Sequence, residues 1–453
     1  MRLLHTSELE LEDFSPSVIP RYAILSHRWG KEEVTFEDMI KGLAQTKKGY
    51  SRIAGSCKQA NNDGYEYIWV DTCCINKDSS AELSEAINSM HAWYKNAGIC
   101  YAYLVDVPDG VNPEKDAKFA SSDWFNRGWT LQELLAPYEV VFFSTGWTRL
   151  GNKSTLCSTL SRITRIDNKV LTGKTPMESL SVAKRMSWAS RRKTSRLEDI
   201  AYCLMGLFDV NMPMIYGEGK KAFLRLQEEI MKDSDDESLF AWMNEEASPN
   251  SLHGLLAESP AWFNHSGDIE TTGGSLSDPP FSKTNKGLRI CSRISPRRGG
   301  YVLTLSCART EDLLSLNIYL RQTYGHEEYA RVMTNEFHWQ GLFTMPTGLE
   351  QYARATINEL LWKDHFKLTP IDPQSLYVRQ DLRTAQCRPV HLRSILHLRS
   401  WPSFQGGYNI HKIAYYSTSG TWETPQIKEI HVLKMVTWNY CLVLPNEDRT
   451  VFF

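Results

Sequence analysis

Apolar runs of strand length alternate with amphipathic segments over the first 150 residues. The runs stop at polar residues, and the segments between them repeat apolar residues at helical spacing. One segment follows Ser79-Ser80-Ala81-Glu82, which fits an S-x-x-E capping box. Such alternation predicts an α/β domain with a mostly parallel sheet that helices cover on both faces. The expected strands are 22–26, 67–71, 100–105 and 140–143, and the expected helices are 50–62, 80–97 and 122–136, the last ended by Pro137.

Helical periodicity continues from 151 to 231 without further strand signals. Ser195-Arg196-Leu197-Glu198 is a second capping-box candidate, before a stretch that places Ile200 and Leu204 on one face. Gly217-Glu218-Gly219 predicts a tight turn into a last amphipathic helix at 222–231. We expect this region to be a helical extension of the 1–150 core.

The composition changes after residue 231. Acidic residues at 233–238 and a Gly-, Ser- and Pro-rich stretch at 265–280 indicate a linker over 232–280. Apolar and polar residues then alternate with the period of a strand, and Gly299-Gly300 is typical of a hairpin turn. We expect a β-rich, sandwich-like domain at 281–453, interrupted by one helix near 351–361.

Composition and charge narrow the classes of function. Of the 453 residues, 42% are hydrophobic and 23% are charged, with a net charge of −2, which is typical of a globular protein and leaves no basic footprint for nucleic acid. No apolar run reaches a membrane-spanning length, and the N-terminus turns acidic at once, so we expect neither a membrane segment nor a leader. Ten cysteines without a CxxC pair predict reduced thiols, a cytoplasmic protein and no metal site.

Polar and aromatic residues follow the expected parallel strands. Ser26-His27-Arg28-Trp29 ends the first strand, Asp71 the second and Asp106 the third. In sheets of this kind, ligands bind beyond the carboxyl ends of the strands, so this is where we expect a site.

Three motifs resemble the fungal heterokaryon-incompatibility (HET) domain. They are Tyr22-Ala23-Ile24-Leu25-Ser26-His27-Arg28-Trp29-Gly30, then Trp69-Val70-Asp71-Thr72-Cys73-Cys74-Ile75, and Arg127-Gly128-Trp129-Thr130-Leu131-Gln132-Glu133-Leu134. The resemblance extends over about residues 1–240. It implies a role in non-self recognition that ends in programmed cell death, a form of innate immunity.

The HET domain is itself similar to TIR domains, which implies a TIR/flavodoxin-like core. Many TIR domains cleave NAD+ with a glutamate that lies in a W-x-x-x-E pattern on a helix after the third strand. Trp129 and Glu133 match that pattern in this chain. The resemblance therefore implies NAD+ as a substrate, with no further cofactor, and Glu133 as the catalytic carboxylate.

Cleavage of NAD+ requires few groups, because nicotinamide leaves as a neutral molecule without a general acid. A carboxylate stabilises the oxocarbenium-like transition state, an aromatic side chain stacks on a ring, and a cation holds the pyrophosphate. We expect substrate binding by the strand-end residues and by the Arg127 segment. The set is Ser26, His27, Arg28, Trp29, Asp71, Arg127 and Trp129, with Arg28 or Arg127 on phosphate and Trp29 or Trp129 as the aromatic wall. The first 150 residues lack G-x-G-x-x-G, which argues against hydride transfer.

Other interpretations remain open at this stage. Glu133 has the sequence context of a solvated helix residue, and Trp129 that of a core residue. The same strand-end surface fits a non-enzymatic signalling module, in which this surface binds a partner and cell death follows from assembly. A homo-oligomer and a protein partner bound through the C-terminal domain also remain open. A cysteine hydrolase requires His27 within hydrogen-bond reach of Cys73 or Cys74.

Overall fold

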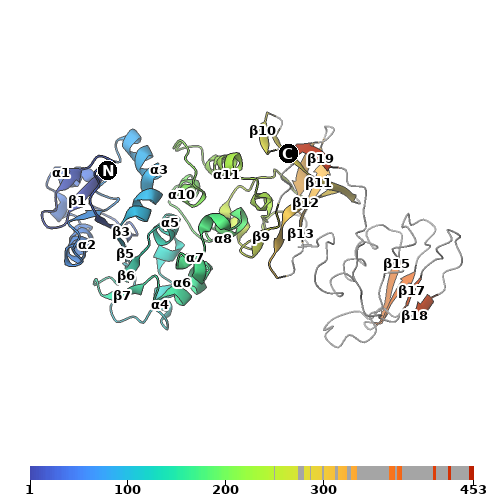
Figure 1. Cartoon of the computed structure of the whole chain (residues 1–453), viewed down its shortest axis with the longest axis horizontal. Coiled ribbons are helices and arrows are strands. Elements are labelled where there is room, and N and C mark those ends of the chain that lie inside the picture. The colour runs from blue at the N-terminus through green and yellow to red at the C-terminus, as the bar shows by residue number, and fades with distance from the viewer. Residues whose placement is uncertain are drawn as a thin grey trace. The chain divides into compact units, whose positions relative to one another are not determined.

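The computed structural model divides the chain into two compact units, which are described separately (Figure 1). The first unit comprises 1–246 and 256–270, and the second 247–255 and 271–453. The described residues are 1–248, 250–273, 280–285, 287–297, 300–311, 315–323, 328–333, 367–372, 375–379, 412–414, 427–429 and 448–452.

A seven-stranded sheet forms the centre of the first unit, in the order β2-β1-β4-β3-β5-β6-β7. Its four central strands are parallel, and β1, β2 and β7 pair antiparallel at the edges. The predicted strands and the α/β class are confirmed. The bounds are β1 Arg2–His5, β2 Leu11–Asp13, β3 Tyr22–His27, β4 Tyr67–Trp69, β5 Ile99–Tyr103, β6 Val140–Phe143 and β7 Arg149–Asn152.

The strand order produces a topological switch point between β3 and β5. From β3 the chain crosses through α2 (Tyr50–Asn62) to β4 on one side, and then through α3 (Ser80–Asn96) back to β5 on the other. Right-handed crossovers in opposite directions place the two helices on opposite faces, and Figure 1 shows the strands between α2 and α3. Every residue of β3 and of β6 is buried, as expected of strands covered on both faces.

The segment between β5 and β6 is less helical than its sequence predicts. Instead of one helix at 122–136, it contains α4 (Ala117–Ala120), the 3-10 turn η2 (Asp123–Asn126) and α5 (Thr130–Leu135). The Gly128 N–H donates to the Lys193 carbonyl at 2.9 Å, which takes the backbone out of helical bonding between η2 and α5. A Cβ at Gly128 would lie 2.6 Å from Thr194 Cγ2, so this approach requires glycine.

The helical extension packs short helices after β7. The predicted Ser195 cap is wrong: α9 begins at Asp199, and Glu198 lies at its N-cap position. The Glu198 carboxylate instead accepts the N–H groups of Gly217 and Gly219, which fixes the predicted turn before α11. The remaining helices of the first unit are α1 Phe36–Ile40, η1 Ala44–Thr46, α6 Cys157–Thr164, α7 Asn168–Leu171, η3 Met177–Ser179, α8 Val182–Ser187, α9 Asp199–Tyr202, α10 Met205–Phe208, α11 Lys221–Asp233, η4 Glu237–Phe240 and η5 Pro260–Phe263.

Part of the region predicted as a linker is packed core. Leu239, Phe240 and Trp242 are buried, and the Trp242 and Trp262 rings lie with their centroids 4.7 Å apart. The Asp236 carboxylate accepts the Val182 N–H at 2.6 Å, so the acidic run contributes a helix cap as well as charge. These contacts belong to the first unit.

The second unit is β-rich, as predicted, and its strands pair mostly antiparallel. Its larger sheet has the order β10-β11-β12-β13-β14-β8, with β19 beside β11, and the smaller is β15-β16-β17-β18. Apolar residues of β13 are buried alternately, which confirms the period-two pattern. The helix predicted near 351–361 lies outside the described residues. Strand bounds are β8 Leu252–His253, β9 Ile269–Thr271, β10 Ser282–Thr284, β11 Gly287–Arg297, β12 Gly300–Arg309, β13 Ser315–Gln322, β14 Tyr329–Val332, β15 Lys367–Asp372, β16 Ser375–Arg379, β17 Lys412–Ala414, β18 Ile427–Glu429 and β19 Asp448–Phe452.

Among the described residues, no helix has the length and apolar character needed to cross a bilayer.

Candidate functional site

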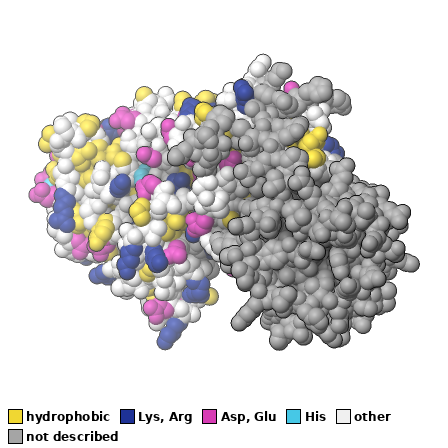
Figure 2. Space-filling model, turned by 45° about the vertical axis from the view of Figure 1, so that its right-hand side comes forward, with side chains coloured by type: hydrophobic (Ala, Val, Ile, Leu, Met, Phe, Trp, Pro, Cys, Tyr) yellow, Lys and Arg dark blue, Asp and Glu magenta, His cyan; other side chains and the backbone are white. Residues whose placement is uncertain are grey.

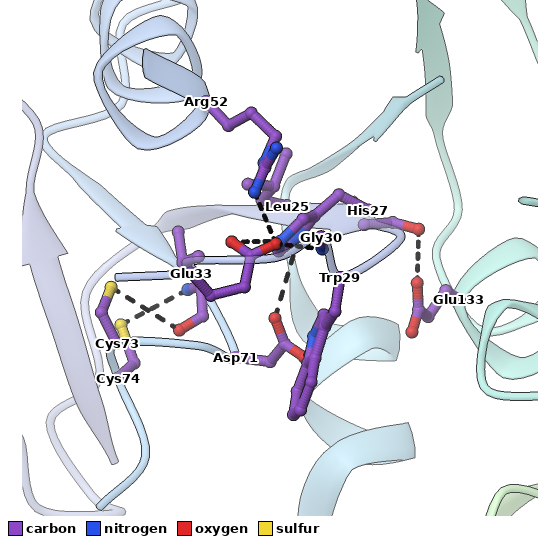
Figure 3. A network of polar contacts seen from close by, with 12 residues as sticks. Leu25, His27, Trp29, Gly30, Glu33, Arg52, Asp71, Cys73, Cys74 and Glu133 are labelled. Atoms are coloured by element: carbon purple, nitrogen blue, oxygen red, sulfur yellow. Dashed lines mark hydrogen bonds and ion pairs between the residues drawn. The ribbon is translucent and has the colours of Figure 1, made fainter. Parts of the chain in front are cut away.

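The carboxyl ends of β3 and β4 bring polar residues to one edge of the first unit's sheet. β3 ends at Ser26 and His27, and Asp71 follows shortly after β4. Neighbouring residues of a strand point to opposite faces, so Ser26 faces α5 and His27 faces α2. Some of the predicted site residues therefore fall into two clusters, and Arg28, Arg127 and Trp129 lie outside both. Figure 3 shows Glu133 on one side of this strand end, apart from Glu33 and Asp71.

Ser26, Trp124 and Glu133 form the first group, here named the Glu133 cluster. The Ser26 hydroxyl donates to Glu133 Oε2 and accepts the Trp124 Nε1–H at 2.8 Å. Glu133 is 7% exposed, and none of the ion pairs between described residues includes it. Burial raises the pKa of this carboxyl to about 8, although the Ser26 hydrogen bond opposes the shift. A carboxyl with a perturbed pKa at a strand end is a candidate for function.

Buried cations hold both ends of α5, the helix that carries Glu133. Arg192 Nη1 donates to the Arg127 carbonyl and to Thr130 Oγ1, each at 2.9 Å. Lys153 Nζ donates to two carbonyls at the other end of the helix, where a cation also complements the helix dipole. Burial lowers the pKa of Arg192 to about 10 and that of Lys153 to about 8. The charges of Arg192 and Arg127 in turn favour the ionised form of Glu133.

The second group lies towards α2 and comprises His27, Glu33 and Arg52, here named the Glu33 cluster. Arg52 Nη2 donates to Glu33 Oε1 at 2.5 Å, and His27 Nε2 lies 3.6 Å from Glu33 Oε2. Burial acts to raise the pKa of Glu33, but the contacts with His27 and Arg52 outweigh it and lower the pKa to about 2. Glu33 is therefore a fixed anion in the neutral pH range.

Asp71 connects the Glu33 cluster to the surface. Its Oδ2 accepts the Trp29 Nε1–H at 2.7 Å, and its Oδ1 lies 3.8 Å from His27 Nδ1, beyond hydrogen-bond distance. These last two atoms are buried and make no hydrogen bond to any described residue. The Trp29 ring is 49% exposed, and Lys77 Nζ lies 3.5 Å from its centroid.

Arg28 is not part of either cluster. Its Nη1 lies 2.5 Å from Asp123 Oδ2, and both side chains are about half exposed. Asp106 lies three residues beyond the end of β5 and accepts the Ser122 hydroxyl at 2.6 Å and the Asp123 N–H at 2.8 Å. Asp106 therefore caps η2 and does not contact Arg127.

Arg127 and Trp129 are both attached to the helical extension. The Arg127 guanidinium donates from both Nη atoms to Ser195 Oγ, at 3.2 and 3.1 Å. Trp129 is half-buried at the N-cap position of α5 and lies against Asp199, whose pKa burial raises. Trp129 has helical backbone dihedrals and its carbonyl accepts the Glu133 N–H at 3.4 Å, so the two residues keep the spacing of one helical turn although α5 is only six residues long.

The geometry does not favour a cysteine hydrolase. The Val70 N–H donates to Cys74 Sγ at 3.3 Å, and Cys73 Sγ lies 3.9 Å from the Val70 carbonyl. The Cys74 thiol and burial hold the pKa of Cys73 well above its ordinary value, which disfavours a thiolate. His27 faces the two carboxylates described above, not these thiols (Figure 3).

Sequence reasoning missed five residues that complete the site: Trp124, Glu33, Arg52, Lys77 and Arg192. Four of them reach their partners from helices or loops outside the motifs, and Trp124 lies just before the third motif. No sequence signal marked these five residues. The sequence could have predicted only that Ser26 and His27 belong to different clusters, because adjacent strand residues face opposite sides of a sheet.

Comparison with known proteins finds a family match over the strands β3, β4 and β5 of this sheet. The family model of the heterokaryon incompatibility protein (HET) matches residues 22–113, which include the ends of β3 and β4 and stop before Glu133. A second family model, described only as a domain of unknown function, matches residues 221–270.

One curated relative is the vegetative incompatibility protein HET-E-1 of Podospora anserina. It is 47% identical over 246 residues, which cover 51% of this chain and 18% of the relative. The chain thus spans less than a fifth of that relative's length. No solved structure matches the chain.

Proposed function

We propose that the chain carries a heterokaryon incompatibility domain, which residues 22–113 match, and that it acts in fungal vegetative incompatibility and triggers cell death. The relative named above is itself a vegetative incompatibility protein, which supports this role. We further propose that the effector activity is hydrolysis of NAD+ at the nicotinamide–ribose bond, centred on Glu133. The TIR-like W-x-x-x-E pattern of Trp129 and Glu133 supports the same assignment.

The observation that carries the enzymatic proposal is a buried carboxyl without an ion pair beside the switch point of the sheet. Ligands of doubly wound sheets bind at such points, next to the ends of β3 and β5. The Ser26 hydroxyl orients Glu133, and the cations Arg127 and Arg192 favour its ionised form. A preoriented carboxylate in a dry environment stabilises a developing cation far better than one in water.

The chemistry then needs no metal and no redox partner. The bond from C1′ of the ribose to the nicotinamide nitrogen breaks, and its electron pair leaves with neutral nicotinamide. Ionised Glu133 stabilises the cationic sugar that remains. Water adds to C1′ and loses one proton, which leaves ADP-ribose.

A second candidate function is a non-enzymatic assembly module. It is favoured by one observation: Glu133 is 7% exposed and hydrogen-bonded, so a substrate reaches it only if the surrounding loops move. In that case the Glu133 cluster stabilises the fold, and cell death follows from partner binding by the surface around Trp29.

Nicotinamide release from NAD+ by the full chain tests the two candidates. Glu133→Gln should reduce turnover by about 10²–10³-fold, whereas Glu139→Gln, a glutamate of the same segment without a described side-chain contact, should leave it unchanged. Turnover by the wild type should also rise with pH up to about 8, as Glu133 ionises. Turnover that survives Glu133→Gln contradicts the assignment of the site, and no turnover at any protein concentration favours the assembly module.

A further inference from the structure

Two cationic residues from distant segments lie side by side next to the Glu133 cluster. The segments 126–128 and 192–194 run parallel, because the Lys193 N–H donates to the Asn126 carbonyl at 2.7 Å and the Gly128 N–H donates to the Lys193 carbonyl at 2.9 Å. This bridge pairs Arg127 with Lys193. Paired residues on neighbouring strands project to the same side, so the two positive side chains share one face.

Like charges directly opposite each other destabilise a pairing unless something compensates them. None of the ion pairs between described residues includes Arg127 or Lys193. The guanidinium of Arg127 donates only to the neutral Ser195 hydroxyl, and the Lys193 side chain is exposed. Both charges are therefore available to an anion.

Several other cations of the first unit form ion pairs. Arg28 pairs with Asp123, Lys184 with Glu270 and Arg225 with Glu218. Figure 2 shows Lys and Arg side chains interspersed with Asp and Glu on the face in view, not gathered into one basic field. The Arg127–Lys193 pair is thus a local feature, suited to a small anion and not to a polyanion such as nucleic acid.

The pair also lies close to Glu133. Arg127 precedes α5, and its charge favours the ionised form of the Glu133 carboxyl. Arg192, the first residue of the second segment, anchors the same helix through the Arg127 carbonyl. An anion on this pair would therefore lie next to the carboxyl that the proposed reaction uses.

We propose that the Arg127 and Lys193 side chains form the subsite for the pyrophosphate group of the dinucleotide. The identity of this ligand rests on the proposed function. A guanidinium contacts two phosphate oxygens at once, and an ammonium adds a point charge, which is a common combination at phosphate sites. The helical extension then contributes to substrate binding through Lys193, in a loop whose sequence is typical of a solvated surface.

Binding of inorganic pyrophosphate to the full chain, measured by calorimetry, tests the anion site without turnover. Lys193→Gln should weaken binding about tenfold, and Arg127→Lys, which keeps the charge but loses the fork, about threefold. Lys58→Gln, an exposed lysine on α2, should bind like the wild type. Unchanged thermal midpoints for Lys193→Gln and Lys58→Gln exclude unfolding as the cause. Equal binding by the wild type and Lys193→Gln overturns the site.

Cleavage kinetics then identify the ligand. Lys193→Gln should raise the KM for NAD+ about tenfold with little change in kcat, and should leave cleavage of nicotinamide riboside, which has no phosphate, unchanged. NAD+ cleavage with an unaltered KM overturns the subsite while the proposed function stands. Pyrophosphate binding that requires Lys193 in a chain that cleaves no NAD+ keeps the anion site but overturns its assignment to the substrate, together with the proposed function.

Discussion

The two sides of the β3 strand end hold carboxyl groups of the same type in opposite electrostatic states. Glu33 contacts Arg52 and His27, and its pKa is lowered to about 2. Glu133 is held by a hydroxyl, and burial raises its pKa to about 8. The adjacent residues Ser26 and His27 face opposite sides of β3, and Ser26 contacts Glu133 while His27 contacts Glu33.

The difference in pairing and pKa between Glu33 and Glu133 indicates which of the two carboxyl groups is available for chemistry. An ion-paired anion such as Glu33 is stable as it is, and its partners would have to be separated before it could act on a substrate. Glu133 changes its protonation state near neutral pH, and a substrate cation would favour its ionised form. We therefore propose a structural role for the Glu33 cluster and a chemical role for the Glu133 cluster.

The largest effect on stability should come from breaking the Glu33 cluster. Glu33→Gln leaves Arg52 as a buried cation without its counter-charge, and we expect a loss of about 3 kcal/mol in the free energy of unfolding. Urea unfolding followed by tryptophan fluorescence at pH 7 measures it. Glu32→Gln is the matched control, because Glu32 forms an exposed pair with Lys48 and should change stability by less than about 0.5 kcal/mol. Equal effects of the two substitutions would contradict the assigned roles.

The next effect is a pH dependence of the stability of the folded chain, caused by the protonation of Glu133. Its folded-state pKa of about 8 lies above its ordinary value of 4.5, so the folded chain binds the proton more tightly than the unfolded chain. The stabilisation is complete below about pH 4.5 and is lost as the pH rises to about 8. One pKa unit corresponds to about 1.4 kcal/mol. Between pH 5 and 8.5, the free energy of unfolding of the wild type should therefore fall by a few kcal/mol relative to that of Glu133→Gln.

Unfolding curves of the two proteins across this pH range measure the difference. Glu139→Gln should follow the wild type throughout. Parallel curves for wild type and Glu133→Gln would show that the carboxyl is already ionised at neutral pH, and would remove the contrast with Glu33.

A smaller effect is expected from the hydroxyl that orients Glu133. Ser26→Ala removes the partner of both Glu133 and Trp124 Nε1 and leaves two buried polar groups unsatisfied. We expect a loss of about 2 kcal/mol in the free energy of unfolding and a lower kcat for nicotinamide release. Ser51→Ala, on the exposed side of α2, is the control and should change neither quantity. A stability equal to that of the wild type would mean that the Ser26 hydroxyl does not bond Glu133.

The sequence was sufficient to predict the four parallel strands of the sheet, because strand and helix periodicities are local properties, but it did not predict the antiparallel edge strands β1, β2 and β7. It also predicted that Ser26, His27 and Asp71 lie at strand ends. The contacts that define the two clusters are not local: Ser26 reaches Glu133 across 107 residues and Trp124 across 98. No spacing in the chain encodes such distances.

Two local predictions are wrong because contacts between distant parts of the chain determine the structure there. A continuous helix at 122–136 agrees with local propensity, but the hydrogen bond from Gly128 to Lys193 interrupts it. Ser195 has the residue type of a helix cap, yet its hydroxyl binds Arg127, and α9 begins four residues later. In both places the contact between the core and the helical extension overrides the local signal.

The smallest expected effect concerns the exposed end of the Glu33 side. Trp29→Phe keeps a ring beneath Lys77 but removes the hydrogen bond to Asp71, and the site is half exposed, so the change in stability should stay below about 1 kcal/mol. Nicotinamide release distinguishes the two roles that the surface around Trp29 has in the competing proposals. If Trp29 stacks on the substrate, Trp29→Ala should raise the KM for NAD+ well above that of Trp29→Phe, because only the ring is lost between them. Equal KM values for wild type, Trp29→Phe and Trp29→Ala would confine substrate binding to the Glu133 side and leave the exposed ring to a protein partner.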